Sequence, residues 1–181
     1  MRVLTRRAAL AGCGSLASPL IARKLLAADE LPDADLTQLM PPVTPPDIAF
    51  TQQNGTERRL GEFKGRGMVL NFWATWCAPC VAEMPALAAL ARTLAPHDVA
   101  VMPLSSDRGG IAAVRRFYEG HAISGLPVLL DPKGAAARAF DVKGIPATVV
   151  IDRQGRQCAR LDGAADWSRP AVAQRILRLV G

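Results

Sequence analysis

Two cysteines separated by two residues are the part of this sequence best suited to do chemistry. They lie in the segment WATWCAPC, residues 73–80, directly after the apolar run at 68–72. Residues 81–91 have strong helix formers and apolar side chains at helical spacing, which predicts that Cys77 lies at a helix N-terminus. Unpaired N–H groups and the helix dipole stabilise an anion there, so we expect the Cys77 thiol to ionise readily. Cys80, one turn further along, is placed to close a disulfide with it.

Other uses of a CxxC pair make different demands on the sequence. A structural zinc site needs four ligands, and the only histidines, His97 and His121, have no neighbouring ligand in the sequence. A purely structural disulfide across so short a loop would stabilise the fold little. A copper-binding assembly factor remains open, since thiolates suit Cu(I), although a third ligand is not obvious. A thiol peroxidase on the same fold is the other alternative; it would use an isolated cysteine with a threonine and an arginine.

Three side chains close to the cysteines are further candidates for the site. Glu83 follows Cys80 by three residues, so it lies on the same side of the helix and is a candidate to relay the proton of the second thiol. An ordinary surface glutamate, favoured by the helix dipole, is the alternative. We expect Trp76 to be exposed and to contribute to an apolar docking surface, and Trp73 to pack in the core.

The charge of the chain is concentrated at its beginning. The net charge is +6, but residues 1–28 carry five of the 22 basic residues and no acidic one, leaving 17 basic against 16 acidic residues. The remainder is therefore nearly neutral, which argues against nucleic acid as a partner. Half of the residues are hydrophobic, enough for a core.

The basic beginning has the pattern of a targeting segment. Arg6 and Arg7 precede a charge-free stretch at 8–22, shorter than the roughly 20 residues that span a bilayer. We expect a twin-arginine-like or Sec export signal and a periplasmic location, with an uncleaved, weakly membrane-associated N-terminus as the alternative. Leu10-Ala11-Gly12-Cys13 also has a weak likeness to a lipidation site.

The remaining sequence divides into a linker and one domain. Residues 29–46 contain four acidic residues and five prolines with little apolar periodicity, which predicts a semi-extended linker. Residues 47–181 are expected to form the domain. Its predicted elements are a hairpin (47–51 and 56–60), a strand (68–72), a helix (77–94), a strand (99–104), a helix (111–118), a short apolar run (126–130), a helical segment (135–140), a hairpin (148–151 and 157–161) and a last helix, with Ser168 as N-cap and Pro170 in its first turn.

Two longer segments resemble a known family. FWATWCAPCVAEMPAL, residues 72–87, and LDPKGAAARAFDVKGIPATVVIDRQG, residues 130–155, resemble the TlpA/ResA branch of extracytoplasmic thiol:disulfide oxidoreductases, with the likeness covering about residues 45–180. The resemblance implies a thioredoxin fold: an α/β domain with a central mixed sheet flanked by helices, an N-terminal hairpin and a central α/β insertion. It also implies a reductant that takes electrons from a membrane thiol protein and passes them to disulfide-containing clients in cytochrome biogenesis.

The resemblance also assigns roles to individual residues. Pro146 matches the family's cis-proline, although most X-Pro bonds are trans, and Ile145 before it would pair with an extended client segment. Neutral Ala78 and Pro79, which has no N–H, stabilise the thiolate little and favour a reductant. The expected catalytic residues are Cys77, Cys80, Glu83 and Pro146, and the expected substrate-binding residues are Trp76, Ala78, Pro79 and Ile145.

The expected domain is a monomer that needs no metal and no organic cofactor. Two cysteines lie outside the predicted site. Cys158 alternates with its neighbours on a predicted strand, which favours a buried, inert thiol. A bridge between Cys13 and Cys158 is the alternative, permitted in an oxidising compartment.

Overall fold

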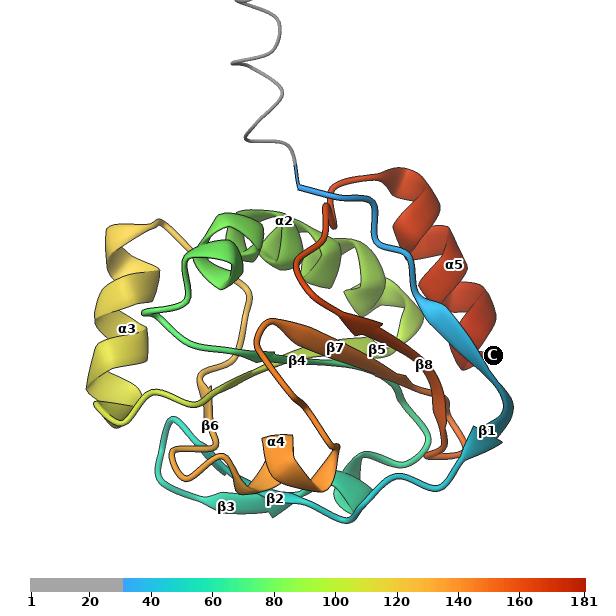
Figure 1. Cartoon of the computed structure of the whole chain (residues 1–181), viewed down its shortest axis with the longest axis horizontal. Helices are drawn as coiled ribbons and strands as arrows, with labels where there is room; N and C mark the ends of the chain where they lie inside the picture. The colour runs from blue at the N-terminus through green and yellow to red at the C-terminus, as the bar shows by residue number, and fades with distance from the viewer. Residues whose placement is uncertain (1–30) are drawn as a thin grey trace, which may run out of the picture. The chain divides into compact units, whose positions relative to one another are not determined.

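The computed structural model describes residues 31–181, which form one mixed sheet with helices against it (Figure 1). The strands are β1 (Thr37–Val43), β2 (Ala49–Gln52), β3 (Glu57–Arg59), β4 (Gly67–Trp73), β5 (Val99–Ser105), β6 (Leu129–Leu130), β7 (Ala147–Ile151) and β8 (Gln157–Asp162). The helices are α2 (Ala78–Leu94), α3 (Gly110–Gly120), α4 (Ala135–Ala139) and α5 (Pro170–Val180), with 3-10 turns at Leu60–Phe63 and Ala95–His97. The sheet order is β1-β8-β7-β4-β5-β6-β2-β3.

The central strand β4 is buried along its whole length and divides the core into two layers. It pairs in parallel with β5 and antiparallel with β7. Successive side chains of a strand point to opposite faces. Accordingly, Val69 and Trp73 pack in one hydrophobic cluster, and Met68, Leu70 and Phe72 pack in the other.

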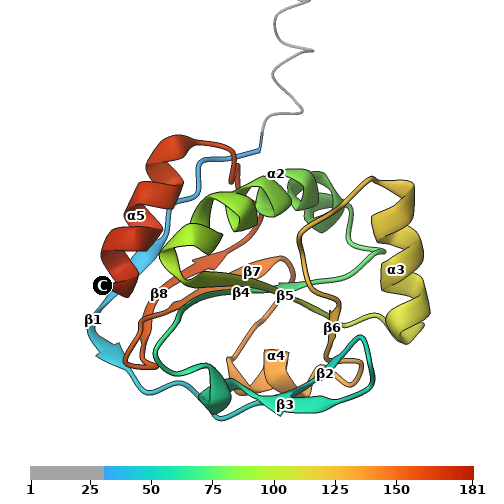
Figure 2. The ribbon, with the colours of Figure 1, turned by 180° about the vertical axis from the view of Figure 1, so that it is seen from behind.

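Helices α2, α3 and α5 contribute to the first cluster, and α4 contributes to the second. Figures 1 and 2 show α2 and α5 on one side of the central strands and α4 on the other. Because β4 runs directly into α2, the N-terminus of α2 lies at the carboxyl end of the central strands. This edge of the sheet is where the CxxC segment is placed.

The predicted α/β fold and the order of its elements are confirmed. The two predicted hairpins are β2–β3 and β7–β8, and the short apolar run becomes β6. One detail is wrong: the N-cap of α5 is Arg169, not Ser168. Ser168 is the residue before the N-cap, and its backbone N–H and hydroxyl donate to Asp166 Oδ1, at 2.9 and 2.5 Å, instead of capping the helix.

The structure differs from the expected linker at 29–46. Residues 37–43 form β1, which pairs antiparallel with β8 at the edge of the sheet, and Leu36 just before it is completely buried. The ordered domain therefore begins before residue 47. Prolines are tolerated on an edge strand, whose outer N–H groups have no partner, and Pro41-Pro42 lie where the β1–β8 register shifts. The predicted export signal, residues 1–28, lies outside the described residues.

Among residues 31–181, no helix combines the length and the apolar character needed to cross a membrane.

Candidate active site

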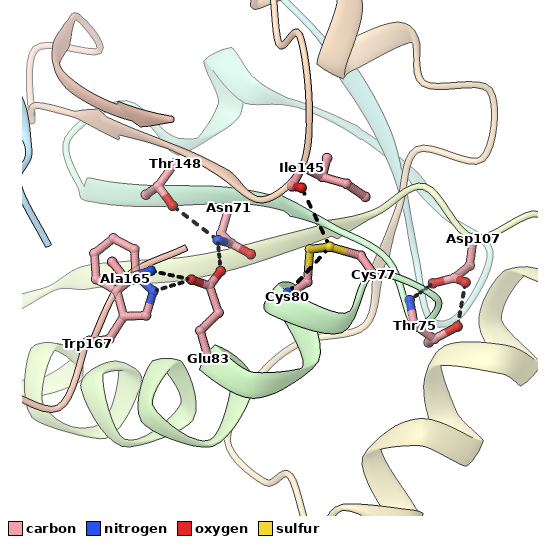
Figure 3. Close-up of a disulfide and its surroundings, with 10 residues drawn as sticks. All are labelled: Asn71, Thr75, Cys77, Cys80, Glu83, Asp107, Ile145, Thr148, Ala165 and Trp167. Atoms are coloured by element: carbon pink, nitrogen blue, oxygen red, sulfur yellow. Dashed lines mark hydrogen bonds between the residues drawn. A yellow bond between two sulfur atoms is a disulfide. The ribbon is translucent and has the colours of Figure 1, made fainter. Parts of the chain in front are cut away.

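Cys77 and Cys80 form a disulfide at the first turn of α2, with an S–S distance of 2.12 Å (Figure 3). Cys77 is the N-cap residue, and its Sγ accepts the backbone N–H of Cys80 at 3.4 Å. Pro79 lies in the first turn and has no N–H to offer the sulfur. Cys80 is completely buried and Cys77 is 6% exposed. A partner molecule therefore reaches Cys77 first, with Cys80 behind it.

The loop between β4 and α2 is held by a buried carboxylate on the neighbouring strand's loop. Asp107 accepts the backbone N–H of Thr75 at 2.9 Å and the Thr75 hydroxyl at 2.6 Å. It also accepts the hydroxyl of Ser105 at 2.7 Å. Asp107 is 3% exposed, so these three donors replace the water that its carboxylate would otherwise bind. These hydrogen bonds fix the conformation of the loop that leads to Cys77.

The loop before β7 faces the disulfide from the other side. The Ile145–Pro146 peptide bond is cis, as the family resemblance implied, and the Ile145 carbonyl oxygen lies 3.6 Å from Cys77 Sγ (Figure 3). The Pro146 carbonyl accepts the N–H of Gly163 at 2.9 Å, which ties this loop to the chain after β8. In the reduced protein, the Ile145 carbonyl would be an acceptor for a Cys77 thiol.

Glu83 is completely buried, one turn after Cys80. Its Oε1 accepts Asn71 Nδ2–H at 2.9 Å, and its Oε2 accepts Ala165 N–H at 3.0 Å and Trp167 Nε1–H at 3.1 Å. The alternative of an ordinary surface glutamate is therefore wrong. Burial raises the pKa of Glu83 above its ordinary value, and the hydrogen bonds from Ala165, Asn71 and Trp167 oppose that rise.

Asn71 connects this carboxylate to the region of the disulfide. Its amide group donates to Glu83 and to Thr148 Oγ1, the latter at 3.1 Å, while its Oδ1 is buried and accepts no hydrogen bond from any group of residues 31–181. In Figure 3 this oxygen points toward the cysteine pair, whereas the Glu83 carboxyl group points toward Asn71. Glu83 thus reaches the site through Asn71 and forms no hydrogen bond of its own with either sulfur.

Sequence reasoning missed Asn71, Asp107 and Trp167. For Asn71 a signal was present, because it is the single polar side chain in the apolar strand Gly67–Trp73. For Asp107 and Trp167 there was no signal, because their hydrogen-bond partners, Thr75 and Glu83, are distant in the sequence and are brought close only by the fold. The other expected site residues lie at the surface around Cys77: Ala78 and Pro79 are exposed, and Ile145 is half-buried.

The two tryptophans beside the cysteines have different environments, as predicted. Trp76 is 70% exposed, next to Cys77. Trp73 is completely buried, with Phe117 and Tyr118 of α3 at ring-centroid distances of 5.2 and 6.0 Å. Only Trp76 is therefore available to a docking partner.

Cys158 lies on β8, buried as predicted, with its Sγ 3.5 Å from the carbonyl oxygen of Val150. Burial raises the pKa of this thiol to about 11, which keeps it protonated and unreactive at neutral pH. The alternative bridge to Cys13 involves a residue outside the described part of the chain. Across residues 31–181, no three side chains of histidine, cysteine, aspartate or glutamate converge as metal ligands.

A thioredoxin fold with a CxxC disulfide at a helix N-terminus and a cis-proline opposite defines a class of proteins, the thiol-disulfide oxidoreductases of the thioredoxin superfamily. The chain belongs to the AhpC/TSA family, whose model matches residues 41–156. Two segments described above lie outside that match: residues 31–40 and the stretch from β8 through α5.

Curated relatives of this class are about a third identical to the chain over the residues that align. The thiol-disulfide oxidoreductase ResA of Geobacillus kaustophilus is 32% identical over 112 residues, 62% of this chain and 63% of that protein. The thioredoxin-like protein YneN of Bacillus subtilis is 34% identical over 111 residues, 61% of this chain and 64% of that protein. The chain thus spans less than two thirds of the length of these two relatives.

Solved structures show the same architecture. A Chlorobium tepidum protein described as the thiol:disulfide interchange protein DsbE has a TM-score of 0.67 and 27% identity, covering 77% of this chain and 97% of its own. The exposed lipoprotein thioredoxin Etrx1 of Streptococcus pneumoniae has a TM-score of 0.62 and 28% identity, covering 74% of this chain and 100% of its own.

Proposed function

We propose that this protein reduces disulfides of client proteins outside the cytoplasm. The observation that carries the proposal is the asymmetric cysteine pair: Cys77, at the helix N-terminus, is the sulfur nearer the surface, and Cys80 is sealed behind it. Such an arrangement suits a nucleophile and a resolving thiol. The names of the curated relatives and of the similar Chlorobium tepidum structure support the same chemistry.

The reaction begins from the reduced pair. The Cys77 thiolate attacks one sulfur of a client disulfide, forming a mixed disulfide and expelling the other client sulfur as a thiolate, which takes up a proton. Cys80 then loses its proton and attacks Cys77 Sγ, closing the disulfide seen here and releasing the second client thiolate. The second client thiolate also takes up a proton, so the client gains two electrons from the pair and two protons, one from Cys80 and one from the solvent. A membrane thiol protein would restore the reduced pair.

The reductive direction is supported by the two residues between the cysteines. Ala78 carries no charge and Pro79 has no N–H, so Cys77 Sγ has the Cys80 N–H as its hydrogen-bond donor within the CxxC turn. A thiolate that receives little stabilisation makes the reduced form the better electron donor. The reaction therefore favours transfer of electrons to the client.

Glu83 and Asn71 would assist the resolving step. Cys80 is buried, so water cannot readily take its proton. The free Asn71 oxygen offers an acceptor on the sulfur side, and the amide of Asn71 holds Glu83 on the other. The raised pKa of Glu83 lets this carboxyl group hold a proton nearer neutral pH than an exposed glutamate does.

Client binding would use the surface around Cys77. The exposed Trp76 and the half-buried Ile145 lie next to Cys77, and the Ile145 backbone would pair with an extended client strand. Such pairing depends on backbone groups and so tolerates different client sequences. The role in cytochrome biogenesis and the periplasmic location are part of this proposal, supported by the family resemblance and the basic, export-like residues 1–28.

Insulin reduction with dithiothreitol as electron donor tests the proposal. We expect Cys77→Ser to abolish the catalysed rate, Cys80→Ser to accumulate a mixed disulfide visible on non-reducing gels, and Cys158→Ser to leave the rate unchanged. Full activity of Cys77→Ser would contradict the proposal. Rapid consumption of hydrogen peroxide without disulfide reduction would favour the peroxidase alternative, and stoichiometric copper after anaerobic purification would favour the copper-binding one.

A further inference from the structure

The two hydrogen-bond donors that reach Glu83 Oε2 come from one short segment of chain, residues 165–167. Ala165 donates through its backbone N–H and Trp167 through its indole N–H, and both residues are buried. This segment lies between β8 and α5, outside the part of the chain that matches the family. The family match therefore does not account for the position of residues 165–167, and the contacts that hold this segment must be found in this structure.

That explanation is the segment at residues 31–36, here called the arm. The Pro32 carbonyl accepts the N–H of Asp166 at 2.7 Å, and Asp33 and Asp166 form a parallel bridge. Successive N–H groups of an extended chain point in opposite directions. The Ala165 N–H therefore faces Glu83 while the next N–H, that of Asp166, faces the arm. The loop is held from both sides.

Side chains fasten the arm in place. Leu36 is completely buried in the same hydrophobic cluster as Ala165 and Trp167. On the outside, Arg169 Nη1 lies 2.6 Å from Asp33 Oδ1, and Arg175 donates to the Leu36 carbonyl. The arm is thus held by core packing on its inner side and by the two arginines on its outer side.

We propose that the arm is a strap that holds Ala165 and Trp167 against the Glu83 carboxylate, making both of them positioning residues for the resolving step. The strap keeps water away from Glu83, and the residues that it holds, Ala165 and Trp167, supply two of the three hydrogen bonds to the Glu83 carboxylate. The proposal rests on the function proposed above for Glu83. Within the family match alone, residues 41–156, Glu83 keeps only the donor from Asn71.

The groups around Glu83 define what its titration reports. From β4 it faces the neutral Asn71, and from the loop after β8 it faces Ala165 and Trp167. Cys77 and Cys80, earlier on α2, do not titrate while they form the disulfide. Asp33, Asp166 and Arg169 bond to one another on the outer side of the strap. In the oxidised protein, the pKa of Glu83 is therefore set by burial and by its three donors.

The test measures this titration directly in the oxidised full-length protein. Infrared difference spectra between acidic and alkaline pH give the carboxyl band of Glu83, assigned by its loss in Glu83→Gln. Trp167→Phe removes one donor while keeping an aromatic ring, so we expect the Glu83 pKa to rise by about one pH unit. Leu36→Ala loosens the strap, which admits water and weakens the two donors. Because burial is the largest cause of the raised Glu83 pKa, the entry of water outweighs the weaker hydrogen bonds, and we expect the Glu83 pKa to fall by about one pH unit.

Leu94→Ala is the matched control. It removes an equally buried leucine from the same cluster at the far end of α2, so it weakens the fold and should leave the Glu83 band unchanged. A merely structural role of the arm would lower the melting temperature in all three variants without moving the Glu83 pKa in opposite directions. Client reduction is assayed separately, so loss of the strap effect and failure of the proposed function are distinguishable.

Amide hydrogen exchange at Asp166 reports whether the strap has opened. If Leu36→Ala does not fold, the double variant Asp33→Ala with Arg169→Ala replaces it, with a smaller shift in the same direction. Faster exchange at Asp166 with an unchanged Glu83 pKa would overturn the proposal. So would unchanged exchange in every arm variant that folds, because the arm would then not hold the loop.

Discussion

At the scale of single residues, the fold has removed the Glu83 carboxyl group from water, one helical turn after Cys80. Glu83 was a candidate because it follows Cys80 by three residues, but spacing alone did not separate a buried relay from a surface side chain. Its complete burial and three donors exclude the surface side chain, while the relay remains a proposal. The consequence is a glutamate whose pKa is raised by desolvation.

This raised pKa predicts a pH-dependent stability. A carboxyl group whose pKa is higher in the folded state than in the unfolded state contributes fully below the unfolded value, here 4.5, and its contribution is lost as pH rises through the folded pKa. Wild type should therefore lose stability relative to Glu83→Gln as pH increases from about 4 toward neutrality, by about 1.4 kcal/mol for each pH unit of pKa difference.

Urea unfolding across this pH range measures the difference in free energy of unfolding between wild type and Glu83→Gln. The change of this difference with pH is the quantity compared, because a glutamine side chain cannot accept all three hydrogen bonds and so shifts the difference at every pH. Replacing the exposed Glu119 by glutamine should preserve the wild-type profile. A constant difference between wild type and Glu83→Gln at every pH would contradict this account of Glu83.

At the scale of elements, the parallel pairing of β4 with β5 brings the CxxC loop and the Asp107 loop to one edge of the sheet. Trp73 and Ser105 are paired at the carboxyl ends of these strands. The residues that follow each strand therefore meet, although Thr75 and Asp107 are 32 positions apart in the sequence. The position of Cys77 thus depends on two strands and not on its helix alone.

We expect Asp107→Ala to destabilise the protein by about 3 kcal/mol, because three donors lose their buried acceptor. The rate of insulin reduction should fall as well, since the loop before Cys77 is released. Urea unfolding and the insulin assay measure both effects. Asp47→Ala, which removes an exposed ion pair with Arg59, should destabilise the protein much less. Equal effects of the two variants would argue against a special role for Asp107.

At the scale of the whole molecule, the C-terminal helix α5 closes the first hydrophobic cluster by packing on the start of β4. A Cβ atom built on Gly67 would lie 2.9 Å from Val180 Cβ, closer than real side chains approach. The Arg153 N–H also donates to the Val180 carbonyl at 3.2 Å. The end of α5 is therefore seated directly on the first residue of the central strand.

Gly67→Ala should accordingly destabilise the protein by about 1–3 kcal/mol through overpacking. Val180→Ala creates room at the same place, so the double variant should be more stable than the sum of the single effects predicts. Thermal unfolding of the four proteins completes the cycle. Gly120→Ala adds the same methyl group where nothing lies within 4 Å, and we expect no loss there. If the destabilisation by the double variant equals the sum of the two single effects, the side chain at position 67 does not clash with Val180.

By itself, the sequence determined the features that depend on neighbouring residues. A strand followed by CxxC and a helix is such a local pattern, and so are the two hairpins predicted at 47–60 and 148–161. They predicted an α/β domain and the cysteine pair, and the likeness of residues 72–87 and 130–155 to a known family implied the thioredoxin fold. Part of the linker predicted at 29–46 was wrong. Residues 37–43 instead form β1, because Leu36 is buried in the core and the next residues pair with the outer edge of β8 despite their prolines.

Only the tertiary structure decided what surrounds the chemistry. The donors to Glu83 from Ala165 and Trp167 are 82 and 84 residues away from it, and the arm that holds them comes from the other end of the domain. Contacts of this kind leave no periodic signal, because they depend on where the sheet order and the helix packing bring distant backbone groups. The pKa of the buried Glu83 depends on burial and on those contacts, so only the folded structure determines it.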